Sequence, residues 1–295
     1  CHLWGNHAGI WCIKDCICQI EGYGEIMIKK IYASDMDGTF LREDHSFDKK
    51  SFRRILDQFK EKDYLFVAAS GRSLQSLKLV FEEFADEIGF VAENGSIVEY
   101  QGQMIFLNEP IRPEVYLPII AGIDAGPYGS SRSMVLSGLE NFYLLKNAEP
   151  QFLGAMTNYY AHFQLVVSFE DVQEKIIKIN AKFTPDEMDQ ARLWLNQTFE
   201  GVTAMTTGFD NIDIIPNGSN KSVGLNHLCS HFGITERDVV AFGDNQNDLD
   251  MLDFAGLAIA SENAREEVKA LADQIIGHCN DGAVLAYLEE EVYGN

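Results

Sequence analysis

The sequence predicts an α/β protein in which a parallel sheet is wrapped by helices and a second α/β domain is inserted into the first. Three observations favour this fold class. Short apolar runs alternate with segments of helical periodicity from Met27 onward. Polar clusters follow several of these runs, where strands are expected to end. The 295 residues also exceed the ~100 to 200 that one domain usually contains.

The core domain is expected to begin with a strand, a helix and a second strand. The largely apolar run from Ile28 to Ala33 predicts a first strand over residues 30–34, and residues 47–62 carry apolar side chains at helical spacing. The second strand is expected over residues 65–69, and a parallel pair joined in this way forms a right-handed crossover. Further apolar runs predict core strands over residues 90–92, 239–242 and 257–260.

A second α/β domain is expected between the two halves of the core. Its predicted strands cover residues 133–136, 142–145, 163–168 and 176–179. The sequence Thr184-Pro185-Asp186-Glu187 matches a capping box with proline at the first helical position, and apolar residues follow at helical spacing. We therefore predict a core domain formed by residues 27–108 and 212–295, with residues 109–211 inserted as the second domain.

Residues 1–26 are expected to be a leader outside both domains. They hold four of the six cysteines, but the spacing Cys12-x3-Cys16-x-Cys18 lacks the paired CxxC of a strong zinc site. The dipeptide Gly24-Glu25 can be encoded by a ribosome-binding sequence shortly before the codon for Met27. We therefore expect these residues to be non-native upstream sequence or disordered, with the native chain beginning at Met27.

The charge balance of the chain is strongly acidic. Asp and Glu outnumber Lys and Arg by 45 to 23, which gives a formal net charge of −22. A field of this sign repels nucleic-acid phosphates and anionic membranes, so we expect neither as a partner. A phosphorylated substrate would need a local positive site, such as a divalent cation together with Lys221. No apolar stretch approaches the ~18 to 20 residues that cross a bilayer, and residues 1–26 lack secretory signal features, so we expect a soluble, cytoplasmic protein.

Four polar clusters each follow or flank an apolar, strand-like run. They are Asp35-Met36-Asp37-Gly38-Thr39, Ser70-Gly71-Arg72, Asn220-Lys221-Ser222 and Gly243-Asp244-Asn245-Gln246-Asn247-Asp248. One such cluster alone is more typical of a plain turn. In a parallel α/β sheet, however, ligands bind beyond the carboxyl ends of the strands, so four clusters at such ends predict a shared site.

In this order, the four clusters resemble the four motifs of the haloacid dehalogenase (HAD) phosphatase superfamily. Three downstream segments resemble its Cof-type subfamily: residues 255–260, Glu262-Asn263-Ala264 and Asn280-Asp281-Gly282. The resemblance covers nearly everything from Met27 to the C-terminus, with the middle third matched only in pattern. It implies a Rossmann-like parallel-sheet core with an inserted α/β cap domain, and a Mg²⁺ cofactor.

The resemblance assigns the chemical steps to the first and last clusters. Asp35 would attack the phosphoryl group and form an aspartyl-phosphate, while Asp37 would protonate the leaving oxygen and then deprotonate water. Mg²⁺ would be held by Asp35, by the backbone carbonyl of Asp37 and by Asp244, all of them oxygen ligands. Asp248 would orient the metal-bound waters or hold Lys221; its structural alternative is an acid favoured at a helix N-terminus.

Phosphate binding would fall to Ser70, Gly71, Lys221 and Asn247, with Asn247 contacting phosphate or Asp35. Ser70 could equally be a helix N-cap, a role compatible with anion binding because helix N-termini attract anions. Arg72 and Asn94-Gly95 are expected near the mouth of the site, where they could meet substrate or cap. Their alternatives are an ordinary ion pair for Arg72 and a tight turn for Asn94-Gly95.

We expect a Mg²⁺-dependent phosphatase for small phosphorylated metabolites, since the resemblance suggests sugar phosphates, pyridoxal phosphate or FMN. A phosphomutase of the same superfamily is the nearest alternative, because it uses the same paired aspartates. A regulator that accepts phosphate or binds a metabolite without turnover is an alternative of another class, and Asp37, Ser70 and the whole cap argue against it. Selectivity is expected in cap residues 110–209, in a monomer or homodimer.

Overall fold

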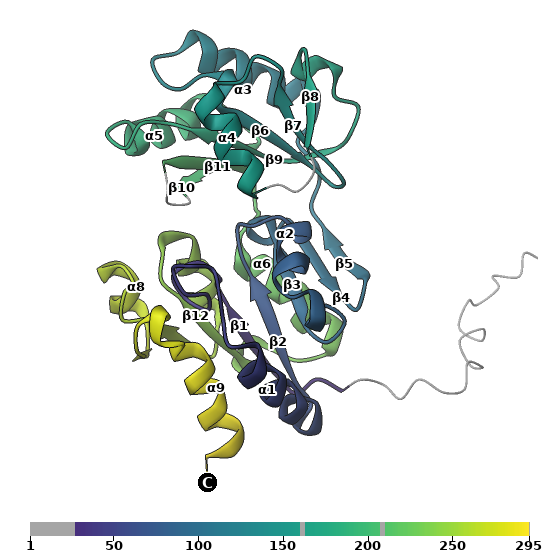
Figure 1. Cartoon of the computed structure of the whole chain (residues 1–295), viewed down its shortest axis with the longest axis vertical. Helices are drawn as coiled ribbons and strands as arrows, with labels where there is room; N and C mark the ends of the chain where they lie inside the picture. Colours follow the sequence, from purple (N-terminus) through teal and green to yellow (C-terminus); the bar gives the residue numbers. More distant parts are fainter. Residues whose placement is uncertain (1–26, 160–162, 207–209, 295) are drawn as a thin grey trace, which may run out of the picture.

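The computed structural model describes residues 27–159, 163–206 and 210–294, and the expected leader over residues 1–26 lies outside them. Within the described residues, the chain forms two α/β units, each built on its own sheet (Figure 1). The larger sheet belongs to the core and the smaller one to the inserted cap. The α/β fold class expected from the sequence is confirmed.

The core sheet has the strand order β14-β13-β12-β1-β2-β3-β4-β5. The strands from β14 to β3 pair in parallel, while β4 and β5 extend one edge in antiparallel fashion. Because β1 lies between β12 and β2, the loops that follow these three strands meet at one edge of the sheet. The strands are β1 (Lys30–Ser34), β2 (Tyr64–Ala69), β3 (Gly89–Ala92), β4 (Ile97–Tyr100), β5 (Gln103–Leu107), β12 (Val239–Gly243), β13 (Leu257–Ala260) and β14 (Gln274–Ile275).

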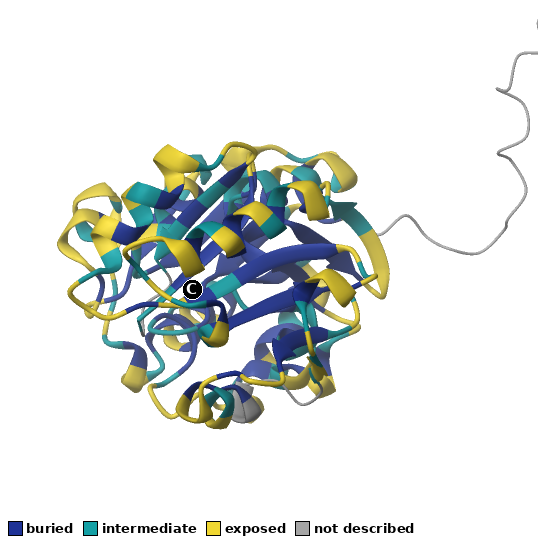
Figure 2. Ribbon diagram, turned by 90° about the horizontal axis from the view of Figure 1, so that it is seen from above, coloured by how far each residue is buried: buried dark blue, intermediate teal, exposed yellow. Residues whose placement is uncertain are grey.

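Helices cover both faces of the core sheet. On one face α1 (Lys49–Lys62), α2 (Leu74–Val80) and α9 (Ala283–Tyr293) bury their apolar sides, and on the other face α6 (Lys221–Phe232), α7 (Leu249–Phe254) and α8 (Glu266–Leu271) do so. Figure 2 shows the strands buried between helices whose outer sides are exposed. Among the described residues, no helix is both long and apolar enough to span a membrane.

The cap is built on a sheet with the order β10-β11-β9-β6-β7-β8, in which only β7 and β8 pair in parallel. Helices α3 (Pro113–Ala125) and α5 (Met188–Thr198) pack on one face of this sheet. Helix α4 (Pro150–Tyr159) packs on the other face, against residues of β6 and β7. The strands are β6 (Met134–Gly138), β7 (Phe142–Leu145), β8 (Phe163–Val166), β9 (Ile176–Lys182), β10 (Val202–Thr206) and β11 (Asn211–Pro216).

Short 3₁₀ turns connect several of these elements and carry parts of the site. They are η1 (Glu82–Phe84), η2 (Glu93–Gly95), η3 (Ser131–Ser133), η4 (Phe169–Asp171), η5 (Glu236–Asp238), η6 (Gln246–Asp248) and η7 (Cys279–Asp281).

The structure corrects the expected boundary between the cap and the second half of the core. The sequence places residues 212–216 in the core, but β11 pairs with β10 and β9 in the cap sheet. An apolar strand has the same pattern in either sheet, so the pattern alone could not assign it. The cluster around Lys221 therefore follows a cap strand and lies at the start of α6.

The start of α5 also differs from the expectation. The predicted capping box placed the helix start at Pro185, whereas α5 begins at Met188. The Glu187 carboxylate accepts a hydrogen bond of 2.6 Å from the Thr184 hydroxyl. This contact closes a turn over residues 184–187 in front of the helix.

Gly95 brings η2 against the start of α6. Its φ of +89° lies in the region that favours glycine, and a Cβ at this position would collide with the backbone carbonyl of Asn220, the N-cap of α6. Only glycine therefore allows η2 and the first turn of α6 to approach so closely.

We predict that Gly95→Ala lowers the free energy of unfolding by at least about 2 kcal/mol, because it adds a steric clash to the strain of the backbone. Gly102→Ala is the matched control, since Gly102 also has a positive φ but a Cβ there meets no atom within 4 Å. Urea unfolding measures both variants. Equal losses for the two would contradict a packing role for Gly95.

Candidate active site

The first cluster follows β1, at the carboxyl ends of the parallel core strands. This end of the core sheet faces the cap (Figure 1). The Asp35 amide donates to the Phe242 carbonyl at 2.9 Å, which places Asp35 beside the end of β12. Its residue exposure is only 6%. Adjacent parallel strands thus bring the clusters that follow β1 and β12 together, as the sequence predicts.

Lys221 joins the third cluster to the first and the fourth. Its side chain is fully buried, and its Nζ lies 2.5 Å from an Asp35 carboxylate oxygen and 2.6 Å from Asp248 Oδ1. The other oxygen of Asp248 accepts hydrogen bonds of 3.0 Å from the amides of Asp244 and Asn245. Asp248 therefore fixes both the Lys221 ammonium and the loop after β12.

Three carboxylates lie near the Lys221 ammonium group, and two of them, Asp35 and Asp248, contact it. Asp35, Asp244 and Asp248 each offer an oxygen, and these oxygens lie within 4.8 Å of one another. Burial raises the pKa of Asp35 despite the opposing charge of Lys221, and Asp248 and Asp244 raise it further. Burial and the neighbouring Asp248 raise the pKa of Asp244 to about 7. Burial alone would lower the pKa of Lys221, but Asp248 and Asp35 together raise it.

The surplus of negative charge and the all-oxygen donor set fit a hard divalent cation. The Thr39 hydroxyl donates to Asp244 Oδ1 at 2.8 Å and orients that carboxylate. Gly38 allows the close approach of the two loops, because its φ is +87° and a Cβ there would lie 2.5 Å from Asp244 Oδ2. The backbone carbonyl of Gly38 accepts from Asn263 at 2.7 Å and from Ser261 at 3.1 Å, so the predicted downstream segment supports this loop.

Asp37 lies at the rim of this cluster, where it pairs with Arg72 and contacts His45. Arg72 contacts both carboxylate oxygens through Nε at 2.6 Å and Nη2 at 2.5 Å, and His45 Nδ1 lies 3.1 Å from Oδ1. Arg72 thus forms the ion pair that was its alternative role, with the predicted proton-transfer residue as its partner. No pattern in the sequence indicated that His45 would lie at this position.

The second cluster forms a loop between β2 and α2. Ser70 is buried, and its hydroxyl oxygen accepts from the Arg72 amide at 3.1 Å. The N-cap of α2 is Ser73, which accepts from the Ser76 amide, so the N-cap alternative for Ser70 is wrong. The Gly71 carbonyl accepts a hydrogen bond of 2.7 Å from Lys178, a cap residue.

Asn94 connects the second cluster to the fourth. It adopts a left-handed conformation in η2, as the Asn-Gly turn signal indicates, and its Nδ2 donates to Asp213 at 3.2 Å. Its side-chain oxygen accepts from Asn247 Nδ2 at 3.3 Å. Asn94 therefore contacts both the cap and the predicted phosphate-binding residue Asn247, whereas Gly95 packs on α6.

A second buried lysine joins the cap to this site. Lys178 in β9 lies 2.6 Å from the Glu93 carboxylate and 3.3 Å from that of Asp213 in β11, and all three side chains are buried. Asn180 donates a further bond of 2.8 Å to Asp213. Sequence reasoning missed this network. The available signal was a charged residue between isoleucines in each strand, because such a residue lies on the opposite face from its apolar neighbours.

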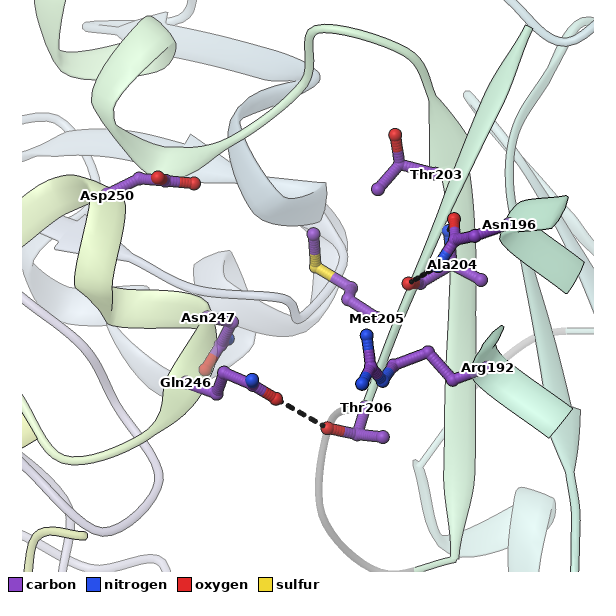
Figure 3. Close-up of a pocket in the computed structure, with 9 residues that line it drawn as sticks. All are labelled: Arg192, Asn196, Thr203, Ala204, Met205, Thr206, Gln246, Asn247 and Asp250. Atoms are coloured by element: carbon purple, nitrogen blue, oxygen red, sulfur yellow. Dashed lines mark hydrogen bonds between the residues drawn. The ribbon is translucent and has the colours of Figure 1, made fainter. Parts of the chain in front are cut away.

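A pocket of about 260 Å³ lies between cap and core beside Asn247. Figure 3 shows cap side chains from α5 and β10 facing core side chains from η6 and α7. The Thr206 hydroxyl and the Gln246 side-chain oxygen lie 3.5 Å apart across it. The pocket is lined by Arg192, Asn196, Thr203, Ala204, Met205, Thr206, Gln246, Asn247 and Asp250.

The fold and these side chains define a two-domain α/β protein, with an acidic site around a buried lysine at the core sheet and a cap inserted into the core. A model of the haloacid dehalogenase-like hydrolase family matches residues 32–288, so the chain belongs to this family. The resemblance to this superfamily found in the sequence is thereby confirmed. The expectation of an enzyme of the phosphatase class is confirmed by the relatives named next, two of which are phosphatases.

Named relatives match over most of their length. The chain is 30% identical to 5-amino-6-(5-phospho-D-ribitylamino)uracil phosphatase YbjI of Escherichia coli, over 88% of this chain and 95% of that protein. It is 27% identical to the HMP-PP phosphatase of Cronobacter sakazakii, over 88% of this chain and 94% of that protein. The solved structure of SMU.1108c from Streptococcus mutans matches with a TM-score of 0.83 and 29% identity, over 90% of this chain and 99% of that one.

We predict that Lys178→Met lowers the free energy of unfolding by about 3–5 kcal/mol at pH 7.5, because two buried carboxylates lose their counter-ion. Lys182→Met is the matched control, since Lys182 lies on the same strand and is exposed. Urea unfolding of both variants against the wild type measures the effect. A loss no larger than that of the control would contradict the role of the network.

We predict that the loss of stability in Lys178→Met depends on pH. Burial raises the pKa of Glu93 above 4.5 while Lys178 opposes this, so removing Lys178 raises it further. Folding raises the pKa of such a carboxyl. Its contribution to stability is therefore fully present below the pKa of the unfolded state, and it is lost as the pH rises through the pKa of the folded state. The destabilisation by Lys178→Met should therefore be smaller at pH 5 than at pH 7.5. An equal loss at both pH values would contradict this.

Proposed function

We propose that this protein is a Mg²⁺-dependent phosphatase that hydrolyses small phosphorylated metabolites through an aspartyl-phosphate at Asp35. The observation that carries the proposal is the buried Lys221 ammonium between Asp35 and Asp248. The names of the relatives support the substrate class, because YbjI and the HMP-PP phosphatase act on small phosphorylated compounds. Phosphorylated sugars and cofactors are the substrates to test first.

Asp35 is the proposed nucleophile. One of its oxygens would form a bond to phosphorus as the bond between phosphorus and the leaving oxygen breaks. Phosphate monoesters repel nucleophiles, so positive charge must lie beside the attacking oxygen. Lys221 lies against Asp35 and meets this need. Water then releases phosphate from Asp35, which splits one difficult displacement into two steps.

Asp35, Asp244 and the backbone carbonyl of Asp37 are the proposed ligands of Mg²⁺, which would neutralise phosphoryl oxygens when bound. The Asp248 oxygens are already occupied by Lys221 and by two backbone amides. We therefore assign Asp248 the positioning of Lys221 and of the loop, which is one of the two roles expected from the sequence.

Asp37 is the proposed acid and base. It would donate a proton to the leaving oxygen in the first step and accept one from water in the second. Its contacts to Arg72 and His45 hold the carboxyl at the rim of the site, where a leaving group would depart. Arg72 must release at least one oxygen of Asp37 for this proton transfer. The approach of the anionic substrate would favour that release, because it offers the guanidinium another anion.

Ser70, Gly71 and Asn247 are the proposed binding groups for the remaining phosphoryl oxygens. The Ser70 oxygen already accepts from the Arg72 amide, so its hydroxyl hydrogen can point to a ligand. Lys178 holds the Gly71 carbonyl, and Asn94 holds the Asn247 amide. Both contacts would keep these groups in place before the substrate arrives.

We predict that Asp35→Asn lowers phosphate release by about a thousandfold or more, because an amide cannot form the phosphoenzyme. Release is measured for sugar phosphates, pyridoxal phosphate, FMN and p-nitrophenyl phosphate, with Mg²⁺ and with EDTA. Asp57→Asn, at an exposed position of α1, is the control. Wild-type release that is independent of metal, or that survives Asp35→Asn, would overturn the mechanism.

We predict that Asp37→Asn slows the cleavage of alkyl phosphates by about a hundredfold or more, and slows that of p-nitrophenyl phosphate much less. An alkoxide needs a proton to depart, whereas p-nitrophenolate is stable without one. Single-turnover rates on the two substrates measure the difference. The same loss on both would show that Asp37 is not the acid.

A further inference from the structure

Arg192 is a charged side chain in the pocket beside Asn247, and its hydrogen bonding is incomplete. Arg192 reaches from α5 past β10, the edge strand of the cap sheet, toward Gln246 and Asn247 (Figure 3). Its Nε is buried and has no hydrogen-bond partner among the residues that the structure describes. A buried donor without a partner is costly, and a small shift of the guanidinium toward an anion bound in the pocket would relieve that cost.

Polar neighbours of Arg192 are already engaged by the cap itself. The Asn196 side chain bonds the Ala204 backbone twice, at 2.9 Å and 2.8 Å. The Thr203 hydroxyl donates to Asn217 at 2.8 Å. These contacts fix the wall of the pocket, whereas the guanidinium has a planar set of donors suited to an oxyanion.

We propose that Arg192 is a specificity residue that binds a second oxyanion, such as a carboxylate, on the leaving group of the substrate. This rests on the proposed function, because the same substrate must place its phosphate at Asp35. Asn247 links the two ends, since it lines the pocket and bonds Asn94 of the phosphate-binding region. The next residue, Asp248, contacts Lys221.

The opposite wall of the pocket carries a negative charge, so the two ends of the pocket differ in electrostatic potential. Asp250 faces it from α7 on the core side, where the residue is exposed to solvent. An anionic group is repelled by Asp250 and attracted by the less exposed Arg192, whose charge is less screened. The oxyanion is therefore placed at the cap end of the pocket, and a hydroxyl or amine of the ligand is favoured near Asp250.

Matched substrate pairs test this inference. Glucitol 6-phosphate and 6-phosphogluconate differ at a terminal hydroxymethyl or carboxylate group, as do glycerol 3-phosphate and 3-phosphoglycerate. We expect the wild type to prefer the carboxylate of at least one pair in kcat/KM, and Arg192→Met to lower that preference about 10- to 100-fold. Arg192→Lys should restore part of it. Arg132→Met is the control, because Arg132 is exposed and bonds the Asn147 carbonyl away from the pocket.

Failure of this inference and failure of the proposed function give different results. Suppose that the wild type releases phosphate from p-nitrophenyl phosphate but does not distinguish the two members of either pair, whether they are tested as substrates or as competing inhibitors. The Arg192 inference is then wrong, and the proposed function stands. The Arg192 inference is also wrong if Arg192→Met lowers kcat/KM equally for both members of a pair. If no compound releases phosphate with Mg²⁺, both proposals are overturned.

Discussion

The buried contact between Lys221 and two aspartates is the interaction on which the site depends. An isolated charge in the interior is strongly unfavourable, so Lys221, Asp35 and Asp248 are stable there only as a group. Lys221 begins a helix on one face of the sheet, while the aspartates follow β1 and β12. Gly95 permits this helix to begin close to the sheet edge. Sheet order, helix packing and the charges of the candidate site are therefore coupled at one point.

The cap is attached to the core by a similar arrangement. Lys178 is a buried lysine between two carboxylates, but here the partners come from both domains. It also bonds the carbonyl of Gly71, and Asp213 bonds Asn94. Polar contacts of this kind require defined geometry, unlike apolar packing, which tolerates sliding. A displaced cap would therefore disturb the loops proposed to bind phosphate, and the cap can influence the chemistry without supplying a reacting group.

The sequence predicted the parts of the molecule that depend on local pattern. Apolar runs located β1, β2, β3, β12 and β13 of the core sheet, and the four polar clusters, taken in their order, resembled the motifs of the family. It placed β11 in the wrong sheet, because an apolar strand has the same pattern wherever it pairs. Sequence reasoning also missed the contacts of His45, Lys178 and Asp213. These contacts join residues that are far apart in the chain or that lie in loops without periodicity. Long-range pairing is set by the whole fold, and one sequence does not reveal it.

The charge of the protein explains why local cations matter so much here. A net charge of −22 opposes an anionic substrate at long range, but salt screens exposed charges beyond roughly 8 Å. Within that distance, a few buried or half-buried cations determine the potential that the substrate meets. In the proposed mechanism, Lys221 and Arg72 lie at the end of the site that would receive the phosphoryl group, which is alike in every phosphomonoester. Arg192 lies in the pocket proposed to hold the leaving group, where substrates differ. A change there is therefore expected to alter selectivity while the proposed reaction at Asp35 is retained.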